Sequence, residues 1–490
     1  MRGIHYIVLL PFLAQSLLME AQSVGIGTNT PKTSALLDLQ SSNKGMLVPR
    51  LSTTQRNSIS NPDRGLLVFD TDKGTFLFYD GSQWRSLLFV NEQFTPPQSR
   101  LSSDRTAGGS FGCSVDISGD YAIIGAKNWS SPAMPNRGAA YIFFKGSNGW
   151  QQQARLFQND SASNDLFGGK VAISGDYAAV SAPTKSNGRG KVYVYKRNET
   201  SWNLEAALTR GAALDGDNFG FGLDITITPA GTPTLAVGIP TADGTDRGQV
   251  LVYSRNNSNG SWSLSQTLNP SDLENGDRFG FSICMDGAYL AAGAPDQDVE
   301  GTSNRGSVYI YLLGSSQFTQ QYKHSGITAG SSFGLSVALN GNLLAVGAPL
   351  AQLFANTSPC VFVLRRTGTN WALTDQIYLP NQSLNALNST YGMAVALNSN
   401  QLMISASGGA EFPNGTGINY SGQLGSVYVY PVQGANFSTT ALRCIRSDFP
   451  FEGDYFGQSI ALDPSGAYIL SDPRQRVNGI QQTGQVLFGN

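Results

Sequence analysis

The stretch FGLSVALNGNLLAVGAP, from Phe333 to Pro349, decides the fold of this chain. An aromatic-glycine pair precedes a short strand of alternating residues, an Asn-Gly turn and an apolar strand. Asn-Gly pairs tolerate the positive φ that two-residue hairpins require. The stretch therefore predicts two antiparallel strands. Near copies begin at six other aromatic residues, namely Phe111, Phe167, Phe219, Phe279, Tyr391 and Phe456.

Each copy continues into a third and a fourth strand. In three copies an aromatic residue opens the fourth strand 17 residues before the next Phe-Gly pair, from Trp150 to Phe167, from Trp202 to Phe219 and from Trp262 to Phe279. Four antiparallel strands per unit are typical of a propeller blade. We therefore predict an all-β fold, a seven-bladed β-propeller of four-stranded blades. In four copies an Arg-Gly pair directly precedes the third strand, at Arg137, Arg189, Arg247 and Arg305.

The seventh unit lacks a fourth strand, because the chain stops at Asn490 directly after the third one. Phe94 precedes Phe111 by the same 17 residues that separate the Trp of three fourth strands from the next Phe-Gly pair. We therefore expect residues 94–103 to complete the seventh blade. Closing the ring in this way would remove open sheet edges.

The chain divides into three expected segments. Residues 1–22 predict a secretory signal peptide, with Arg2, an apolar run and a small residue at the cleavage point. A membrane anchor is the alternative, but the apolar run is shorter than the roughly 20 residues of a spanning helix. Residues 23–90 predict a small β-rich N-terminal module or spacer, and residues 91–490 the propeller. We expect a secreted protein, extracellular or on the cell surface, without a transmembrane segment.

Charge and cysteine content exclude several classes of protein. The formal net charge is −2 and only 13% of the residues are charged, so nucleic acid is not an expected partner. The four cysteines lie far apart in the sequence, and we expect them to be unpaired. We predict no cofactor.

The pattern Phe-Gly-x-Ser-Val followed by Val-Gly-Ala-Pro resembles the FG-GAP repeats of integrin α-subunits and of many bacterial exported proteins. The resemblance covers Phe94 to Asn490 and implies an integrin-like propeller with an adhesive or ligand-binding role. Near the N-terminus, VGIGTNTP and GMLVPRLSTTQR resemble a segment of bacterial exported and tail-fibre-like surface proteins. That segment is either a spacer or a self-association or docking module.

Calcium-binding FG-GAP blades carry an acidic loop between the first two strands, and this chain lacks it. Its turns hold at most one acid each, whereas Ca²⁺ prefers six to eight oxygens. We therefore predict no metal there. Acidic segments before the Phe-Gly pairs could attract a cation, and we favour a turn-capping role for their aspartates. These segments are DGDNFG (215–220), NGDRFG (275–280) and EGDYFG (452–457).

Repeated residues favour structural roles. Burial of a Phe stabilises by roughly 1.5 to 3 kcal/mol, so the Phe-Gly aromatics are expected to be core wedges between blades. The Arg-Gly arginines could bind a carboxylate ligand, but salt bridges are our preferred interpretation. Their expected partners precede the Phe-Gly pairs, at Asp165, Asp217, Asp277 and Asp454.

Catalysis has little support in the sequence. The only histidines are His5 and His324, so no histidine triad or zinc cluster is expected, and His324 is predicted to be a solvated surface residue. A carboxylate-dependent glycoside-active enzyme and a carbohydrate-binding lectin are the alternatives. Regular spacing favours packing roles for the tryptophans of the outer strands, Trp150, Trp202, Trp262 and Trp371.

We therefore expect a non-enzymatic interaction module that binds an extracellular protein or glycan through loops on one propeller face. The propeller itself is expected to be monomeric. Phe412 and Tyr420, in the longest loop, are the expected anchors, unless they only pack that loop onto the propeller. The further candidate contacts are Glu411, Asn419, Trp129, Asp243 and Asp296.

Overall fold

Strands make up 53% of the computed structural model, and helix is almost absent. The all-β prediction is therefore confirmed. The structure describes residues 24–490, except for 33, 73–74, 82–83, 87–96, 105, 157, 327, 351–358, 380–389, 408, 412–416, 420–424, 434–435, 439–440, 447–454 and 476–482. The chain divides into two compact units after residue 93. Each unit is described by itself below.

The N-terminal unit contains short strands and one helical turn. Three strands between Gly65 and Leu87 form an antiparallel meander. Two parallel pairings precede them and were not predicted. The strands are β1 (Val24–Ile26), β2 (Leu37–Leu39), β3 (Arg50–Leu51), β4 (Leu67–Asp70), β5 (Thr75–Tyr79) and β6 (Trp84–Ser86).

Helix α1 (Thr53–Asn57) follows β3 and positions a buried ion pair. Ser52 and Gln55 form a reciprocal capping box at its start. Arg56 Nε lies 3.2 Å from a carboxylate oxygen of Asp70, and both side chains are buried. Thr53 Oγ1 donates to the same carboxylate at 3.0 Å. The helix is thereby fixed to the meander.

Residues 94–490 form a succession of antiparallel sheets, here numbered 1 to 7. Sheet 1 contains β8 (Phe111–Ser118), β9 (Tyr121–Ala126), β10 (Ala139–Gly146) and β11 (Gly149–Leu156). Sheet 2 contains β12 (Val171–Ser174), β13 (Tyr177–Ala182), β14 (Lys191–Asn198) and β15 (Ser201–Leu208). Sheet 3 contains β16 (Gly222–Ile227), β17 (Pro233–Ile239), β18 (Gln249–Arg255) and β19 (Trp262–Leu268). Sheet 4 contains β20 (Ile283–Asp286), β21 (Tyr289–Ala294), β22 (Ser307–Leu313) and β23 (Phe318–Ser325).

The remaining sheets follow the same order. Sheet 5 contains β24 (Ser336–Asn340), β25 (Leu343–Ala348), β26 (Cys360–Thr367) and β27 (Asn370–Tyr378). Sheet 6 contains β28 (Thr390–Leu397), β29 (Gln401–Ser407), β32 (Ser426–Gln433), β33 (Asn436–Phe437) and β34 (Arg443–Arg446). Sheet 7 contains β35 (Ile460–Leu462), β36 (Tyr468–Asp472), β37 (Gln485–Gly489) and, from the start of the unit, β7 (Gln98–Arg100).

Strand β7 joins the beginning of this unit to its end. It pairs antiparallel with β37, placing Arg100 opposite Val486 and Gln98 opposite Phe488. Ser99 Oγ also donates to Gln485 Oε1 at 3.1 Å. The predicted fourth strand of the last sheet is therefore confirmed for Gln98–Arg100. Phe94, which served to predict it, lies outside the described residues.

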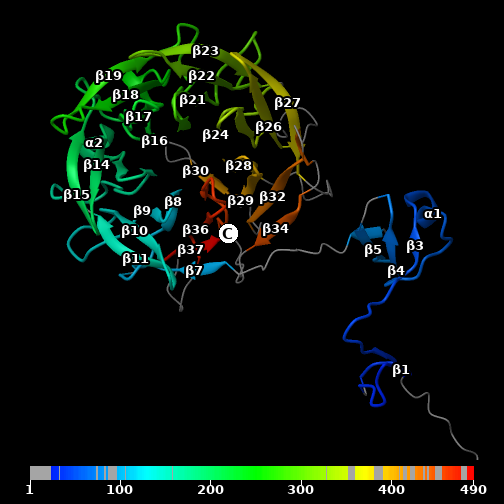
Figure 1. Cartoon of the computed structure of the whole chain (residues 1–490). Coiled ribbons are helices and arrows are strands. Elements are labelled where there is room, and N and C mark those ends of the chain that lie inside the picture. The colour runs from blue at the N-terminus through cyan, green and yellow to red at the C-terminus, as the bar shows by residue number, and fades with distance from the viewer. Residues whose placement is uncertain are drawn as a thin grey trace, which may run out of the picture. The chain divides into compact units, whose positions relative to one another are not determined.

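The sheets follow one another around a ring (Figure 1). The first strand of each sheet contacts the first strand of the next, from β8 and β12 through to β28 and β35. Strand β35 in turn contacts β8. The first strands therefore line the centre of the ring, and the fourth strands lie at its outer edge.

Glycines of the repeat hold neighbouring sheets together. Gly248, of an Arg-Gly pair, has a φ of +84°, and a Cβ there would lie 2.1 Å from the carbonyl oxygen of Phe279 in the next sheet. Phe279 N–H donates to Arg247 O at 2.9 Å. Only glycine permits this approach. The same contact joins Gly138 to Phe167, Gly190 to Phe219, Gly306 to Phe333, Gly425 to Phe456 and Gly484 to Phe111.

Aromatic residues form the core between the sheets. The seven aromatic residues of the Phe-Gly pairs are all buried. Phe279, for example, contacts Tyr309 edge to face in its own sheet and belongs to a cluster with Val250 of the preceding sheet. Outer-strand tryptophans also bridge sheets, as Trp150 stacks on Phe488 of sheet 7 at 4.6 Å. These residues occupy the core positions that their spacing indicated.

Candidate functional site

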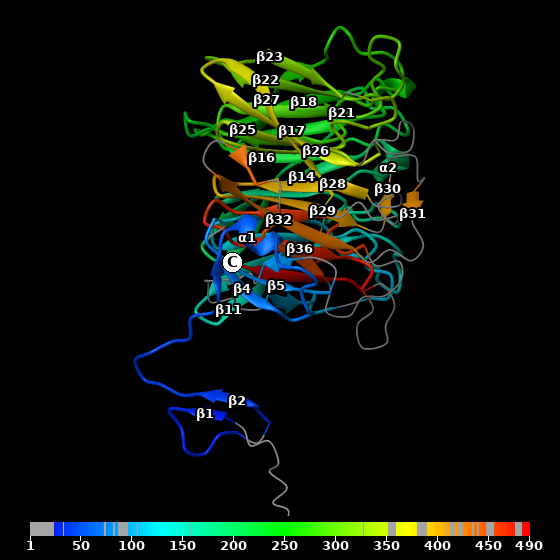
Figure 2. The same cartoon turned by 90° about the vertical axis from the view of Figure 1, so that its right-hand side faces the viewer.

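One side of the ring carries the longer loops. Antiparallel strands put successive connections at opposite ends, so the loops from second to third strands share a side with those from fourth to first strands. We call this side the loop face. It includes residues 127–138, 183–190 and 295–306. Figure 2 shows α2 (Lys185–Gly188), β30 (Gly409–Glu411) and β31 (Gly417–Asn419) on it, at the right-hand edge.

The long loop of sheet 6 forms a hairpin on the loop face. Its strands β30 and β31 pair antiparallel, with Gly409 opposite Asn419 and Glu411 opposite Gly417. The structure therefore places the backbones of two candidate contacts, Glu411 and Asn419. The two expected anchors, Phe412 and Tyr420, lie outside the described residues.

The other three candidate contacts are engaged within the protein. Trp129 Nε1 donates to Asp104 O at 2.8 Å, and the Arg155 guanidinium lies 3.7 Å from its ring centroid. Asp296 forms an ion pair of 2.9 Å with Arg278, and both side chains are largely buried. Asp243 pairs with Arg210. These contacts give all three residues a structural role in their loops.

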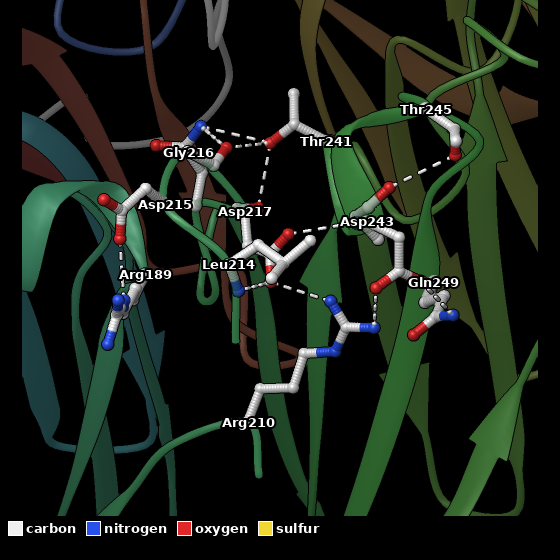
Figure 3. Close-up of polar contacts among 12 residues, drawn as sticks. Arg189, Arg210, Leu214, Asp215, Gly216, Asp217, Thr241, Asp243, Thr245 and Gln249 are labelled. Carbon is white, nitrogen blue, oxygen red and sulfur yellow. Dashed lines mark hydrogen bonds and ion pairs between the residues drawn. The ribbon is translucent and has the colours of Figure 1, made fainter. Parts of the chain in front are cut away.

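The acidic segment before Phe219 is a capped turn (Figure 3). One carboxylate oxygen of Asp217 accepts the Leu214 N–H at 2.8 Å and an Arg210 N–H at 2.7 Å. The other accepts the Asp243 N–H at 3.0 Å. Thr241 Oγ1 donates to the backbone carbonyl of Asp217 at 2.8 Å. The carboxylate of Asp217 is therefore used to fix the turn.

The same capping bond recurs in two other sheets. Asp165 accepts the Ala162 N–H at 2.7 Å, and Asp277 accepts the Glu274 N–H at 2.8 Å. All three aspartates are buried. Asp454 lies outside the described residues. Among the residues that the structure describes, no group of three His, Cys, Asp or Glu side chains is placed to hold a metal ion.

The expected salt bridges between Arg-Gly arginines and these aspartates are wrong for the pairs the structure describes. Asp165 pairs with Lys185 at 2.8 Å, and Asp217 pairs with Arg210 at 2.7 Å. Arg189 instead pairs with Asp215 in an exposed contact. The buried aspartates face cations that enter the turn from neighbouring strands and loops, which the Arg-Gly side chains do not do. Arg247 donates to Leu273 O at 2.7 Å, Arg137 to Ser161 Oγ at 3.0 Å, and Arg305 pairs with Glu300.

His324 is not the solvated surface residue that the sequence predicted. Its ring stacks on Tyr322 and contacts Phe333 edge to face at 5.5 Å. Its Nε2 is buried and has no hydrogen-bond partner among the described residues. Burial lowers the pKa of His324. The residue is therefore a packing element beside the Phe-Gly pair of sheet 5.

A cavity of about 400 Å³ lies where the first strands begin, at the loop-face end of the ring. All seven sheets contribute the residue that directly follows their Phe-Gly pair. These residues are Cys113, Gly169, Phe221, Phe281, Leu335, Met393 and Gln458. The site was not predicted, because this position lies at the start of the first strand of each repeat and was assigned no separate role from the sequence.

The cavity has an apolar side and a cationic side. Phe221 and Phe281 contact each other with ring centroids 4.9 Å apart, and Leu335 and Met393 continue this side. Lys170 and Lys127 line the other side. Burial lowers the pKa of Lys170, Cys113 opposes that shift, and the charge of Lys127 adds to it.

The other end of the first strands carries two half-buried acids, Asp116 and Asp224. Asp116 accepts the N–H of Ile173 in the neighbouring sheet at 2.7 Å, besides that of Ile117. Burial raises the pKa of Asp116 to about 7. Asp224 accepts the N–H of Met285 in the same manner, and burial raises its pKa as well. These acids connect adjacent first strands by hydrogen bonds.

Comparisons with known proteins identify two families in the chain. A phage tail like trimerisation region matches residues 25–101. The FG-GAP repeat matches residues 98–143, 150–195 and 262–311, so both resemblances drawn from the sequence are confirmed. No curated protein matches the chain. The crystal structure of Saccharomyces cerevisiae Sqt1 is similar over 80% of this chain and 99% of that chain, with 12% identity and a TM-score of 0.44.

Within the described ranges, none of the helices combines the length and apolar composition needed to cross a bilayer.

Proposed function

Because the chain carries FG-GAP repeats, we propose that it is a non-enzymatic adhesion or ligand-binding module, secreted or displayed at the cell surface. Residues 94–490 would form a closed seven-bladed propeller that binds an extracellular protein or glycan through the loop face. The observation that carries the proposal is a cavity lined by residues from all seven sheets, open among the variable loops. Variable loops on a rigid scaffold are where binding residues concentrate.

Closure of the propeller is supported by contacts at the last interface. Strand β7 pairs with β37, and β35 contacts β8. Gly484 meets Phe111 across this interface as Gly248 meets Phe279 within the ring. Six of the seven interfaces between described sheets share this glycine contact, and such a ring would provide the rigid base that the loops need.

A binding role fits the cavity better than glycoside hydrolysis does. Glycosidases use two carboxylates on opposite sides of the scissile bond. The titratable groups that line this cavity are instead Lys127, Lys170 and Cys113. The half-buried acids Asp116 and Asp224 accept backbone N–H groups between strands. The chemistry of the cavity is therefore that of a receptor for an anion.

A protein partner is favoured over a lectin role. Sugar binding by propellers uses exposed aromatic rings, and Trp150, Trp202 and Trp371 are buried in this chain. Trp262 contacts Tyr177 of the preceding sheet, and Arg155 covers Trp129. These rings pack within the protein and do not form a sugar platform.

The N-terminal unit is proposed to trimerise the chain. Its match to a phage tail like trimerisation region agrees with its surface. Many large apolar side chains are exposed in this unit. Exposed apolar patches of this kind mark interaction sites. Three linked propellers would gain avidity without any new contact. The exposed residues are Val24, Ile26, Leu36, Leu37, Leu39, Met46, Leu47 and Leu66.

Two variants test the trimer in the full chain. Replacement of Leu36 and Leu47, both exposed, by Asp should convert a trimer to a monomer in light-scattering mass measurements. The control replaces Leu204 and Leu264, exposed leucines of the outer strands, and should leave the mass unchanged. A wild-type chain that is already monomeric would refute trimerisation.

A screen of the full chain on protein and glycan arrays tests the proposed function. We expect binding to extracellular proteins in preference to glycans. The pair of changes Phe412→Ala and Tyr420→Ala then separates two roles of the sheet 6 loop. Lost binding at an unchanged melting temperature supports an interaction site. Unchanged binding with a lower melting temperature would mean that the loop only packs.

A further inference from the structure

We propose that the cavity at the loop-face end of the ring binds a small organic anion, with its acidic group between Lys127 and Lys170 and its apolar part against Phe221 and Phe281. The proposal rests on the proposed function, since it names a ligand class for the loop face. It also goes beyond it, because a small molecule would be bound independently of any macromolecular partner.

The size of the cavity suits a small ligand. Its volume of about 400 Å³ lies within the range of small-molecule sites, roughly 300 to 1,000 Å³. The cavity is built by one position of the repeat from every sheet. Such a wall is held by the Phe-Gly pairs directly beside it, which are buried and fixed by backbone contacts. The site is therefore preformed.

The positive charges of Lys127 and Lys170 in the cavity lining favour an anionic ligand. Lys170 lines the cavity, and among the described residues its ammonium group makes no hydrogen bond or ion pair. The titratable neighbours that act on Lys170 are Cys113 and Lys127, and no carboxylate is among them. Desolvation and the charge of Lys127 both lower the pKa of Lys170, so an acidic ligand group would offset an unfavourable environment. The Lys170 side chain is exposed, and an anion in the cavity can therefore reach its ammonium group and pair with it.

The repeat itself marks Lys170 as an exception. The equivalent positions in the other sheets hold small residues, namely Ser114, Gly222, Ser282, Ser336, Ala394 and Ser459. A serine at this position contacts the next sheet, as Ser336 Oγ donates to Gly392 O at 2.7 Å. Lys170 forgoes that inter-sheet bond and gives its side chain to the cavity. At this one position, a residue that elsewhere bonds neighbouring sheets together is replaced by a lysine that can bind a ligand.

The apolar residues of the cavity lining indicate that the ligand also has an apolar part. Sheets 1 and 2 contribute Lys127 and Lys170 to the cavity lining, and sheets 3 to 6 contribute Phe221, Phe281, Leu335 and Met393. Aromatic rings and a thioether offer contacts to a flat or flexible apolar body. Inorganic phosphate would use only the lysines and should therefore bind weakly. The geometry points to an aromatic or aliphatic carboxylate or sulfonate.

Calorimetric titration of the full chain tests this class with three probes of equal shape. Naphthalene-2-sulfonate is the anion, 2-naphthol the neutral analogue and 2-naphthylmethylammonium the cation. We expect the anion to bind roughly tenfold or more tightly than the neutral probe, because an interaction with a charged group contributes more than a neutral one. The cation should not bind. Equal affinity for the three probes, or no binding of the anion, would overturn the proposal.

Variants test the residues. Lys170→Met should weaken binding of the anion roughly tenfold or more and leave the neutral probe unaffected. Lys170→Arg should retain the affinity, and so should the control Lys196→Met on strand β14. Melting temperatures of all variants establish that they fold. If Lys170→Met binds the anion like wild type, the proposal is wrong. An array hit on the loop face without anion binding would overturn this inference and leave the proposed function standing.

Discussion

Replacement of Gly484 by Ala should open the interface that closes the ring. Gly484 has a φ of +80°, and a Cβ at this position would lie 2.1 Å from the carbonyl oxygen of Phe111. Ordinary contacts begin near 3.4 Å, so sheets 7 and 1 would have to separate locally by about 1.3 Å. The hydrogen bond of 3.2 Å from Phe111 N–H to Thr483 O would then break.

The magnitude follows from three contributions. A non-glycine residue with left-handed geometry costs roughly 1 to 2 kcal/mol, and the lost hydrogen bond about 1 kcal/mol. A gap of 0.5 to 1 Å forfeits a quarter to a half of the dispersion contacts on a buried side chain such as Phe111, or about 1 kcal/mol. We therefore expect a loss of roughly 3 to 4 kcal/mol in the free energy of unfolding.

Two other glycines provide matched controls in the same denaturant unfolding assay. Gly248→Ala makes the equivalent change inside the ring, with φ +84° and 2.1 Å to Phe279 O, and should cost as much. Gly231 has a φ of +75° but nothing within 4 Å of its Cβ, so Gly231→Ala should cost only the backbone strain, roughly 1 to 2 kcal/mol. A closed ring is refuted if Gly484→Ala costs no more than Gly231→Ala.

Two further predictions concern metal and pH. Chelation with EDTA should leave the melting temperature unchanged, because Asp217 is occupied by Arg210 and backbone N–H groups; a large drop restored by Ca²⁺ would show a metal site. Burial raises the pKa of Asp116 from 3.8 to about 7, so between those pH values the unfolded chain has released a proton that the folded protein keeps. Stability should therefore fall as pH rises from 4 to 7, by up to about 4 kcal/mol at 1.36 kcal/mol per pKa unit. Asp116→Asn should flatten this decline in melting temperature between pH 4.5 and 7.5, and an equally steep decline in the variant would exclude Asp116 as its cause.

Much of the fold could be predicted, because the repeat places turn-forming glycines and core-forming aromatic residues at regular positions. Positive-φ glycines such as Gly341 specify tight turns, and the aromatic residues of the Phe-Gly pairs specify the core. Both properties depend on residue type at a fixed spacing. The closing strand could be found for the same reason, since the distance from Phe94 to Phe111 matches that of three other fourth strands. Helix α1 was missed although Ser52 and Gln55 carry a capping box.

Ion pairs were predicted less well than the strands. The choice of Lys185 and Arg210 as partners of Asp165 and Asp217 depends on how loops bring side chains together, and spacing does not encode this. His324 was misplaced for a similar reason. An outer strand usually exposes alternate residues, but Tyr322 and Phe333 enclose this imidazole.

The cavity was missed although the sequence holds a signal for it. Residues directly after the Phe-Gly pairs vary widely between repeats, from Gly169 to Phe281, while the pairs themselves hardly vary. Variation at a position that the fold directs to the ring centre indicates a binding surface. Lys170 stands where the other repeats hold small residues. A binding role for Lys170 can be inferred only from the structure, which shows that the residues after all seven Phe-Gly pairs line one cavity.

The most direct test of the account measures whether the loop face carries the binding activity. The strongest array hit is titrated with two variants of the full chain that differ in the face they alter. One replaces the β30–β31 hairpin, residues 409–419, by a short Gly-Ser linker, and the other changes Glu199 and Thr200, in a turn at the opposite end of the strands, to Lys. The account predicts that binding is lost in the first variant and kept in the second. Binding that survives the first change, or is lost only with the second, would contradict it.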